Sequence, residues 1–160
     1  MSAIVLLDTS IYMNVLDIPG WNQHREIVLA DFGTKIDNSD IFLLPMAAIW
    51  ETGNHIARLA DGATRRKYAD LLVKDVQLAI TGQHPYRPTH FPNRDEFQRW
   101  LGTFPDYAMR NKTPAKTTEG ISLSDCSIIN EFYRTCEKHP MSNVYIWSLD
   151  LDLNSYVQCA

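Results

Sequence analysis

The sequence has few cysteines and no long apolar run. Its three cysteines, Cys126, Cys136 and Cys159, form no C-x-x-C pair and cannot all pair with one another, which argues against a disulfide framework. No apolar stretch approaches the ~20 residues that cross a bilayer, and the N-terminus has no basic segment followed by a long apolar one. We therefore expect free thiols, no secretion signal, no membrane partner and a cytoplasmic location.

The five histidines lack the spacing of zinc ligands, and the chain has no internal repeat and no low-complexity tract. A mixed His/Cys zinc site is therefore not expected. With 160 residues, 45% of them hydrophobic, the chain can bury one ordinary core. We expect a single domain over residues 1–160.

Charge is distributed unevenly along the chain. The net charge is −4, but residues 1–57 carry 2 Lys and Arg against 7 Asp and Glu, residues 58–118 carry 11 against 6, and residues 119–160 carry 2 against 6. This pattern is compatible with an acidic site built from the two ends and a basic middle that binds a polyanion. A solvated helical surface in the middle explains the charges equally well.

Apolar patterning predicts strands that alternate with helices. Residues 3–7 and 144–149 are continuous apolar runs, typical of strands buried on both faces of a parallel sheet, and residues 41–44 form a shorter one. Helical spacing predicts helices at about 21–35, 45–60, 63–81 and 123–138. This alternation predicts an α/β protein, a three-layer α/β/α sandwich around a central, mainly parallel sheet.

The segment at about 83–120 differs in character from the rest. It begins with the proline-rich "GQHPYRPTHFPNRDEF" and continues with the polar, basic "MRNKTPAKTTEG". We interpret it as an insertion within the domain, made of loops around a short helix at 95–101.

Acidic residues follow two of the predicted strands. Asp8 comes directly after the run at 3–7, and Asp150 comes after "VYIWSL". Carboxyl ends of parallel strands meet at the edge where ligands bind. Two carboxylates there repel each other unless a cation neutralises them, so a hard divalent metal is expected.

Two further acids lie in predicted helices. Glu51 shares a polar helix face with Asn54, His55 and Arg58, and Asp125 falls in the first turn of the helix at 123–138, where the helix dipole favours a carboxylate.

Each acid also has a purely structural interpretation. Ser122 and Asp125 match a capping box, Asp8 can cap the helix that follows it, Asp150 can end its strand, and Glu51 can lie on the surface. Four acids that all lie at strand ends or in helices are less easily explained by coincidence than any one of them alone.

The order of these motifs resembles the PIN domain family of metal-dependent ribonucleases, which includes the VapC-type toxins. "IVLLDTSIYMNVL" resembles the family's first strand and acid, and "LLPMAAIWETGNHI" its helix with the glutamate. "ISLSDCSII" is similar to the third acidic motif, and "VYIWSLDLDL" to the strand that ends in the Thr-x-Asp motif. The resemblance spans residues 4–153.

The resemblance implies four catalytic, metal-binding carboxylates that hold Mg²⁺ or Mn²⁺: Asp8, Glu51, Asp125 and Asp150. Ser148 stands where the family often has threonine, and Ser10 matches a second small polar position. Asp152 competes with Asp150 for the fourth role. Two departures stand out: the gap between Glu51 and Asp125 is long for a minimal toxin, and only ten residues follow Asp150, so the final strand must be short or missing.

Basic side chains of the middle segment are candidates for phosphate contacts, which give affinity without reading sequence. They form two groups, Arg58, Arg65, Arg66 and Lys67, and then Arg110, Lys112 and Lys116. Tyr86, Phe91 and Trp100 either stack on unpaired bases or anchor the core and loops.

The resemblance implies an endoribonuclease that hydrolyses phosphodiester bonds of single-stranded or structured RNA and leaves a 5′-phosphate. As a toxin it would have an antitoxin partner that occludes the acidic site, and because family members commonly dimerise, a homodimer is compatible with it. The alternative is a catalytically inactive PIN-like scaffold that binds RNA or a protein partner.

Overall fold

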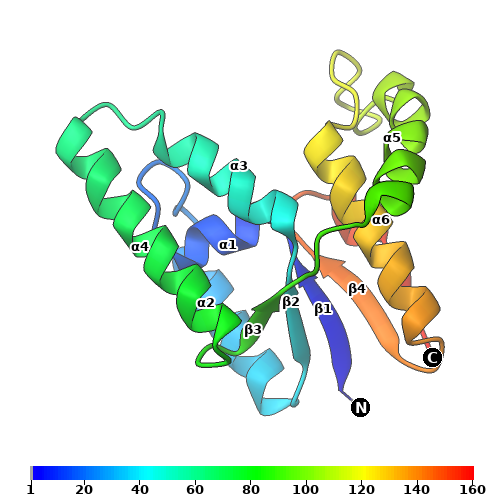
Figure 1. Ribbon diagram of the computed structural model, residues 1–160, viewed down its shortest axis with the longest axis horizontal. Helices are drawn as coiled ribbons and strands as arrows, with labels where there is room; N and C mark the ends of the chain where they lie inside the picture. Colours follow the sequence, from blue (N-terminus) through cyan, green and yellow to red (C-terminus); the bar gives the residue numbers. More distant parts are fainter. Residues whose placement is uncertain (1) are drawn as a thin grey trace.

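A computed structural model describes residues 2–160. Figure 1 shows a central sheet with helices on both sides. The strands are β1 (Ala3–Leu7), β2 (Ile41–Leu44), β3 (Tyr86–Pro88), β4 (Asn143–Trp147) and β5 (Val157–Gln158). The helices are α1 (Thr9–Val15), α2 (Arg25–Asp37), α3 (Met46–Ile56), α4 (Gly62–Ile80), α5 (Arg94–Met109) and α6 (Leu123–Lys138), followed by a 3₁₀ turn at Leu153–Ser155.

The sheet has the strand order β3-β2-β1-β4-β5, and only β5 runs antiparallel to its neighbour in the part of the chain that the structure describes. All five residues of β1 are buried, because strands flank it on both edges and helices cover both its faces. The predicted three-layer α/β/α sandwich with a mainly parallel sheet is confirmed.

Alternate residues of β1 feed two hydrophobic cores. Ala3, Val5 and Leu7 pack with α1, α2, α3 and α4 on one face of the sheet. Ile4 and Leu6 pack with α6 and with Val144 and Ile146 of β4 on the other. In Figure 1 the first four helices accordingly lie on one side of the sheet and α5 and α6 on the other.

The segment at 83–120 is more ordered than its sequence suggests. It contains β3, which pairs with β2, and its helix is not a short one at 95–101 but runs from Arg94 to Met109. A capping box between Asn93 and Glu96 starts this helix, and Pro105 lies inside it. Proline disfavours a helix interior, so its presence made the helix look shorter in the sequence.

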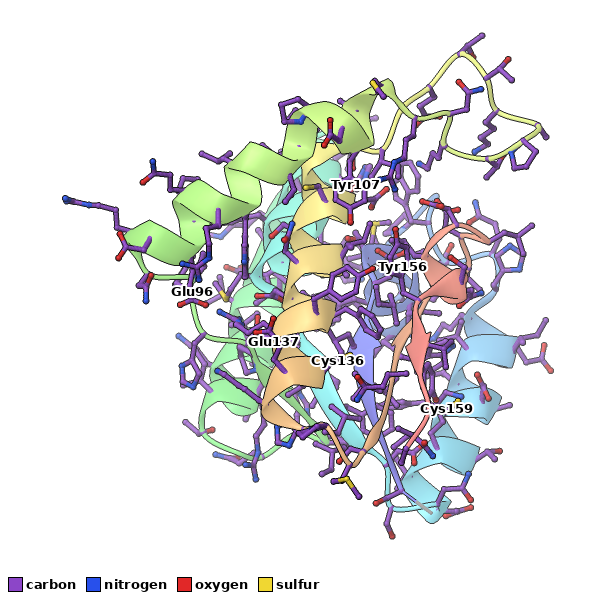
Figure 2. The ribbon with its side chains drawn as sticks, turned by 90° about the vertical axis from the view of Figure 1, so that its right-hand side faces the viewer. Glu96, Tyr107, Cys136, Glu137, Tyr156 and Cys159 are labelled. Carbon is purple, nitrogen blue, oxygen red and sulfur yellow. The ribbon has the colours of Figure 1, made fainter. Side chains whose placement is uncertain are left out.

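The end of the chain returns along α6. Tyr156 lies 5.8 Å from Phe132 and 6.2 Å from Tyr133, measured between ring centroids, and Figure 2 shows it beside this helix. The following strand, β5, has only two residues, so the last strand is short, as expected. No helix between residues 2 and 160 is both long and apolar enough to cross a membrane.

The loop between α5 and α6 is anchored at both ends. The Lys112 N–H donates to the Glu119 carbonyl at 2.8 Å, and the Ile121 N–H donates to the Tyr107 carbonyl at 3.3 Å. Gly120 lies so close to α5 that a Cβ on it would be 2.0 Å from the Ala108 carbonyl oxygen. Backbone cannot give way as a flexible side chain can, so this position requires glycine.

Gly120→Ala is therefore expected to lower the free energy of unfolding by about 2 kcal/mol, because the loop must move away from α5 to admit the methyl group. Gly102→Ala is the matched control: Gly102 lies in α5 with no atom within 4 Å of its would-be Cβ. The control should be neutral or stabilising by up to about 1 kcal/mol. Chemical denaturation measures both, and equal effects of the two changes would contradict the close-contact explanation.

Candidate active site

Asp8 stands at the carboxyl end of β1 because of strand register. Leu7 pairs with Trp147 in the parallel β1–β4 ladder, and the Asp8 N–H donates to the Trp147 carbonyl at 3.0 Å. This register sets Asp8 beside Ser148. Asp8 occupies the N-cap position of α1, but its carboxylate makes no capping hydrogen bond, so capping does not explain it.

Two serine hydroxyls hold the Asp8 carboxylate. The hydroxyls of Ser10 and Ser148 both donate to Asp8 Oδ2, at 2.8 and 2.7 Å. Ser10 Oγ in turn accepts from the Leu149 N–H, and Ser148 Oγ accepts from the Asp150 N–H. Asp8 is only 5% exposed, and burial raises its pKa against these hydrogen bonds. The serines therefore fix the first acid to the loop that carries the fourth.

Asp150 and Asp152 follow β4 in a tight turn. Asp150 Oδ1 accepts from the Asp152 N–H at 3.1 Å, which leaves Oδ2 directed at Lys112, 3.5 Å from Nζ. Burial, and then the charge of Asp150, raise the pKa of Asp152. The contact to Lys112 favours Asp150 over Asp152 as the member of the acidic cluster.

Glu51 projects from α3 and is held by α1. The Thr9 hydroxyl, which is buried, donates to Glu51 Oε2 at 2.9 Å. The His55 Nε2 lies 3.8 Å from the other oxygen, and the His55 ring packs on Trp21 with centroids 4.2 Å apart. Glu51 is thus fixed in direction rather than free on the surface, and His55 has a packing partner of its own.

Asp125 enters from α6, on the opposite side of the sheet from α1. Ser122 is the N-cap of this helix and accepts from the Asp125 N–H at 3.0 Å. The capping is therefore done by the serine, and the Asp125 carboxylate is left to the site. Burial raises the pKa of Asp125 to about 7, and the negative charges of Asp8, Glu51 and Asp150 add to this rise.

Hydrogen bonds and ion pairs link these four acids: Ser148 joins Asp8 to the Asp150 backbone, Thr9 holds Glu51 beside Asp8, and Lys112 lies between Asp125 and Asp150. We call Asp8, Glu51, Asp125 and Asp150 the acidic cluster. The structure brings all four to one end of the sheet from β1, α3, α6 and the turn after β4.

Lys112 supplies positive charge to this cluster. Its Nζ lies 3.5 Å from Asp150 Oδ2, 3.9 Å from Asp125 Oδ2 and 3.3 Å from Glu119 Oε1. Burial opposes the charged form, but the carboxylates of Asp125, Glu119 and Asp150 outweigh burial and raise the pKa of Lys112. The lysine is therefore charged, and its ammonium faces the acidic cluster instead of solvent.

The donors of the acidic cluster suit a hard cation in their chemistry. Carboxylate oxygens are the ligands that Mg²⁺ and Mn²⁺ prefer. As they stand, no three Asp, Glu, His or Cys side chains within residues 2–160 converge closely enough to hold a metal ion. The residues fit a divalent cation by type and by charge, and in this arrangement the Lys112 ammonium provides the neutralising charge.

A cleft of about 870 Å³ opens beside Glu51. Its walls come from α3, the segment before α5, α5 itself and the first turn of α6. The polar face predicted for α3 lines it, with Glu51, Asn54, His55 and Arg58. Exposed apolar side chains line it too, namely Trp50, Phe91, Phe97, Leu101 and Leu123. A flexible chain with apolar or aromatic groups would fit such a cleft.

The other predicted substrate cations lie apart from this cleft or pair locally. Arg65 donates to the carbonyls of Leu59 and Ala60, and Arg66 pairs with Asp70 along α4. Lys67 lies over the ring of Tyr68, and Arg110 lies over the ring of Tyr107. Lys116 is exposed in the loop after α5. Of the seven, Arg58 lies in the cleft and Lys112 at the acidic cluster.

The three candidate stacking aromatics have different surroundings. Tyr86 is 2% exposed and donates its hydroxyl to Asp75, so its ring is closed to RNA and its role is structural. Trp100 lines the cleft but carries the Arg134 guanidinium 5.0 Å from its ring centroid. Phe91 is exposed in the cleft, 5.5 Å from Trp50.

Two residues that line or support the site, Trp50 and Thr9, were not singled out from the sequence. Trp50 lies next to Glu51 in the sequence, and an exposed tryptophan beside a candidate acid was a usable signal. Thr9 gave no such signal, because its contact to Glu51 joins residues 42 positions apart.

No protein-family model matches the sequence, and no curated protein matches it either. The structure is similar to VapC20 of Mycobacterium tuberculosis, described as a sarcin-ricin loop cleaving toxin, with a TM-score of 0.56 and 14% identity over 91% of each chain. It is also similar to FitAcB from Neisseria gonorrhoeae, with a TM-score of 0.51 and 18% identity over 94% of this chain and 91% of the other. At these identities the likeness is one of fold: the chain has the VapC-like PIN fold that its motifs predicted.

The raised pKa of Asp125 predicts how stability depends on pH. Between its ordinary pKa of 3.8 and about 7, the folded protein holds a proton there that the unfolded chain releases, so metal-free stability falls as pH rises through this window. Asp125→Asn should flatten this fall and, at pH 8 in EDTA, stabilise the fold by roughly 2–4 kcal/mol. Asp70→Asn, on the surface of α4, should leave the slope unchanged. Parallel wild-type and Asp125→Asn curves in pH-dependent denaturation would contradict the assignment.

Proposed function

We propose that this PIN-fold chain is a metal-dependent endoribonuclease that acts as the toxin of a toxin–antitoxin pair. The observation that carries the proposal is that Asp8, Glu51, Asp125 and Asp150 come from four separate elements to the carboxyl end of a parallel sheet, where hydrogen bonds and ion pairs hold them. The fold likeness to VapC20, a toxin that cleaves the sarcin-ricin loop, supports RNA as the substrate.

Asp8, Asp125 and Asp150 would hold Mg²⁺ or Mn²⁺, with Glu51 beside them. Such a cation, when bound, supplies positive charge that polarises a phosphodiester and makes a water more acidic. The chain's own residues keep this site in shape: the Ser10 and Ser148 hydroxyls orient Asp8, and the Thr9 hydroxyl orients Glu51.

Glu51 is the residue we assign to the attacking water. It lines the cleft, and its Oε2 is fixed by Thr9, so its carboxylate can orient a water or take up its proton. Attack of the water on phosphorus forms a new P–O bond and breaks the bond to the 3′ oxygen, which takes a proton from solvent as it leaves. The products are a 3′-hydroxyl on one fragment and a 5′-phosphate on the other.

The cleft beside Glu51 is where we place the RNA strand. Trp50 and Phe91 offer exposed rings on which unpaired bases stack without sequence preference, and Arg58 offers a phosphate contact. The same apolar lining suits an antitoxin segment that covers the acidic cluster and keeps RNA out, and a homodimer remains compatible with this arrangement.

One observation favours the alternative of a PIN-like scaffold that binds RNA or protein without cleaving. Lys112 already neutralises part of the acidic cluster, and within residues 2–160 no three ligands converge. A cleavage assay distinguishes the two functions, because only the nuclease hydrolyses RNA at the acidic cluster.

Asp8→Asn is expected to abolish RNA cleavage while leaving the fold intact, because it removes a charge from the cluster but keeps the side-chain shape. The purified protein is incubated with labelled single-stranded RNA, a sarcin-ricin stem-loop and DNA, each with Mn²⁺, Mg²⁺ or EDTA. We expect cleavage only with metal, and about a hundredfold to a thousandfold less in the variant, the size of effect that electrostatic groups have in active sites.

Asp70→Asn is the control, since this carboxylate is exposed and pairs only with Arg66 on α4. It should cleave as the wild type does. Cleavage in EDTA, or undiminished cleavage by Asp8→Asn, would refute the four-carboxylate mechanism. A folded protein that binds but never cuts any of these substrates would favour the scaffold.

Trp50→Ala is expected to weaken RNA binding about tenfold, the value of one stacked base. The measurement is fluorescence anisotropy with single-stranded RNA in the Asp8→Asn background. Trp50→Phe keeps an aromatic face and should lose less. Stability should change little because Trp50 is 64% exposed. Equal RNA affinities of the alanine variant and its parent would contradict the placement of RNA against Trp50.

A further inference from the structure

Lys112 is the feature that the proposed reaction leaves unexplained. Among the lysines and arginines of residues 2–160, it alone has ion pairs with the acidic cluster. It comes from the loop between α5 and α6, which Figure 1 shows at the same end of the molecule as the carboxyl ends of β1 and β4. From the sequence, Lys112 was expected to contact phosphate together with Arg110 and Lys116, yet its side chain is only 15% exposed.

The loop holds this lysine in place. The Lys112 backbone is bonded to Glu119, and Gly120 is pressed against α5, so the stem of the side chain starts from a fixed point. A cation tethered this way loses less entropy on entering the cluster than a free one does.

Lys112 also has an ion-pair partner outside the acidic cluster, Glu119. Its Nζ is 3.3 Å from Glu119 Oε1, closer than to either Asp125 or Asp150. The Glu119 side chain is about half exposed, so it lies at the outer edge of the site, toward solvent. A small rotation of the lysine stem would take the ammonium out of the cluster without leaving it unpaired.

A divalent cation held by Asp125 and Asp150 would occupy the neighbourhood of the ammonium. Two positive charges a few ångströms apart repel, and in a partly buried site water screens them poorly. The Lys112 Nζ lies 3.9 Å from Asp125 Oδ2 and 3.5 Å from Asp150 Oδ2, where such a cation would need both oxygens. Lysine and metal therefore compete for the same oxygens.

We propose that Lys112 is a built-in counter-ion, which neutralises Asp125 and Asp150 in the metal-free protein and is displaced toward Glu119 when a divalent cation binds. This inference rests on the proposed function, because it assumes that the acidic cluster is a metal site. It assigns Lys112 a positioning role: the residue keeps the cluster assembled before the metal arrives and lowers the affinity for that metal.

The test measures Mn²⁺ binding and not activity. Isothermal titration of Mn²⁺ compares the full-length wild type with Lys112→Met, which keeps the length of the stem but removes the charge. The variant should bind Mn²⁺ about tenfold more tightly, within the usual range of coupling between two ligands of one site. It should also unfold at a lower temperature in EDTA and gain more from added Mn²⁺ than the wild type does.

Three further variants separate charge from packing. Lys112→Arg keeps the charge and should bind Mn²⁺ much as the wild type does. Lys116→Met removes an exposed charge from the same loop and should change nothing. Glu119→Gln takes away the ion-pair partner outside the acidic cluster and should weaken Mn²⁺ binding severalfold, opposite to Lys112→Met. This last variant keeps the test decisive even if Lys112→Met folds poorly.

The outcomes distinguish this inference from the proposed function. Mn²⁺ binding by the wild type, with equal or weaker binding by Lys112→Met, or with no loss in Glu119→Gln, overturns the counter-ion and leaves the metal site standing. Binding by Lys112→Met but not by the wild type supports the counter-ion in its strongest form. No binding by any variant overturns both, because the acidic cluster is then not a metal site.

Discussion

Repulsion between carboxylates at one end of a parallel sheet is the constraint that shapes the rest of this structure. The β1–β4 register sets Asp8 next to Ser148, and the turn after β4 brings Asp150 to the same edge. Burial, and then the like charges nearby, raise the pKa of Asp125 and cost stability, so each carboxylate needs a hydrogen-bond donor or a cation. Hydroxyl donors hold Asp8 and Glu51, and an ammonium faces Asp125 and Asp150.

The site also depends on the sandwich as a whole. Glu51 belongs to α3, whose Ala47 packs in the same core as α6, and Asp125 belongs to α6 itself. These two helices start at the same end of the sheet, so the second turn of α3 and the first turn of α6 bring one acid each to the strand ends. The cleft lies between them, closed on its far wall by α5. The acidic cluster and the cleft beside it thus arise from one junction of layers.

A single variable, the positive charge in the acidic cluster, separates the nuclease from the non-cleaving scaffold. With a divalent cation, the carboxylates of the cluster would serve the proposed phosphodiester hydrolysis. With the Lys112 ammonium alone, the cluster is partly neutralised, as the non-cleaving alternative requires. The fold likeness to VapC20 is compatible with both states, because a fold specifies where a site lies and not which cation fills it.

Local patterns in the sequence were enough to predict the sandwich, its main strands and most helices, because burial on both faces of β1 and the helical spacing of apolar residues are properties of short segments. They also placed each of the four acids after a strand or in a helix, and their joint role as a metal site stays a prediction. Features that depend on distant partners could not be predicted in this way, and the role of Tyr86 was left open between base stacking and the core. The helix containing Pro105 continues to Met109, Tyr86 is buried against Asp75, and Lys112 points inward to the acids. These features follow from tertiary contacts, because the free energy of a buried hydroxyl or of a neutralised carboxylate depends on which groups folding brings together, and no local pattern records that.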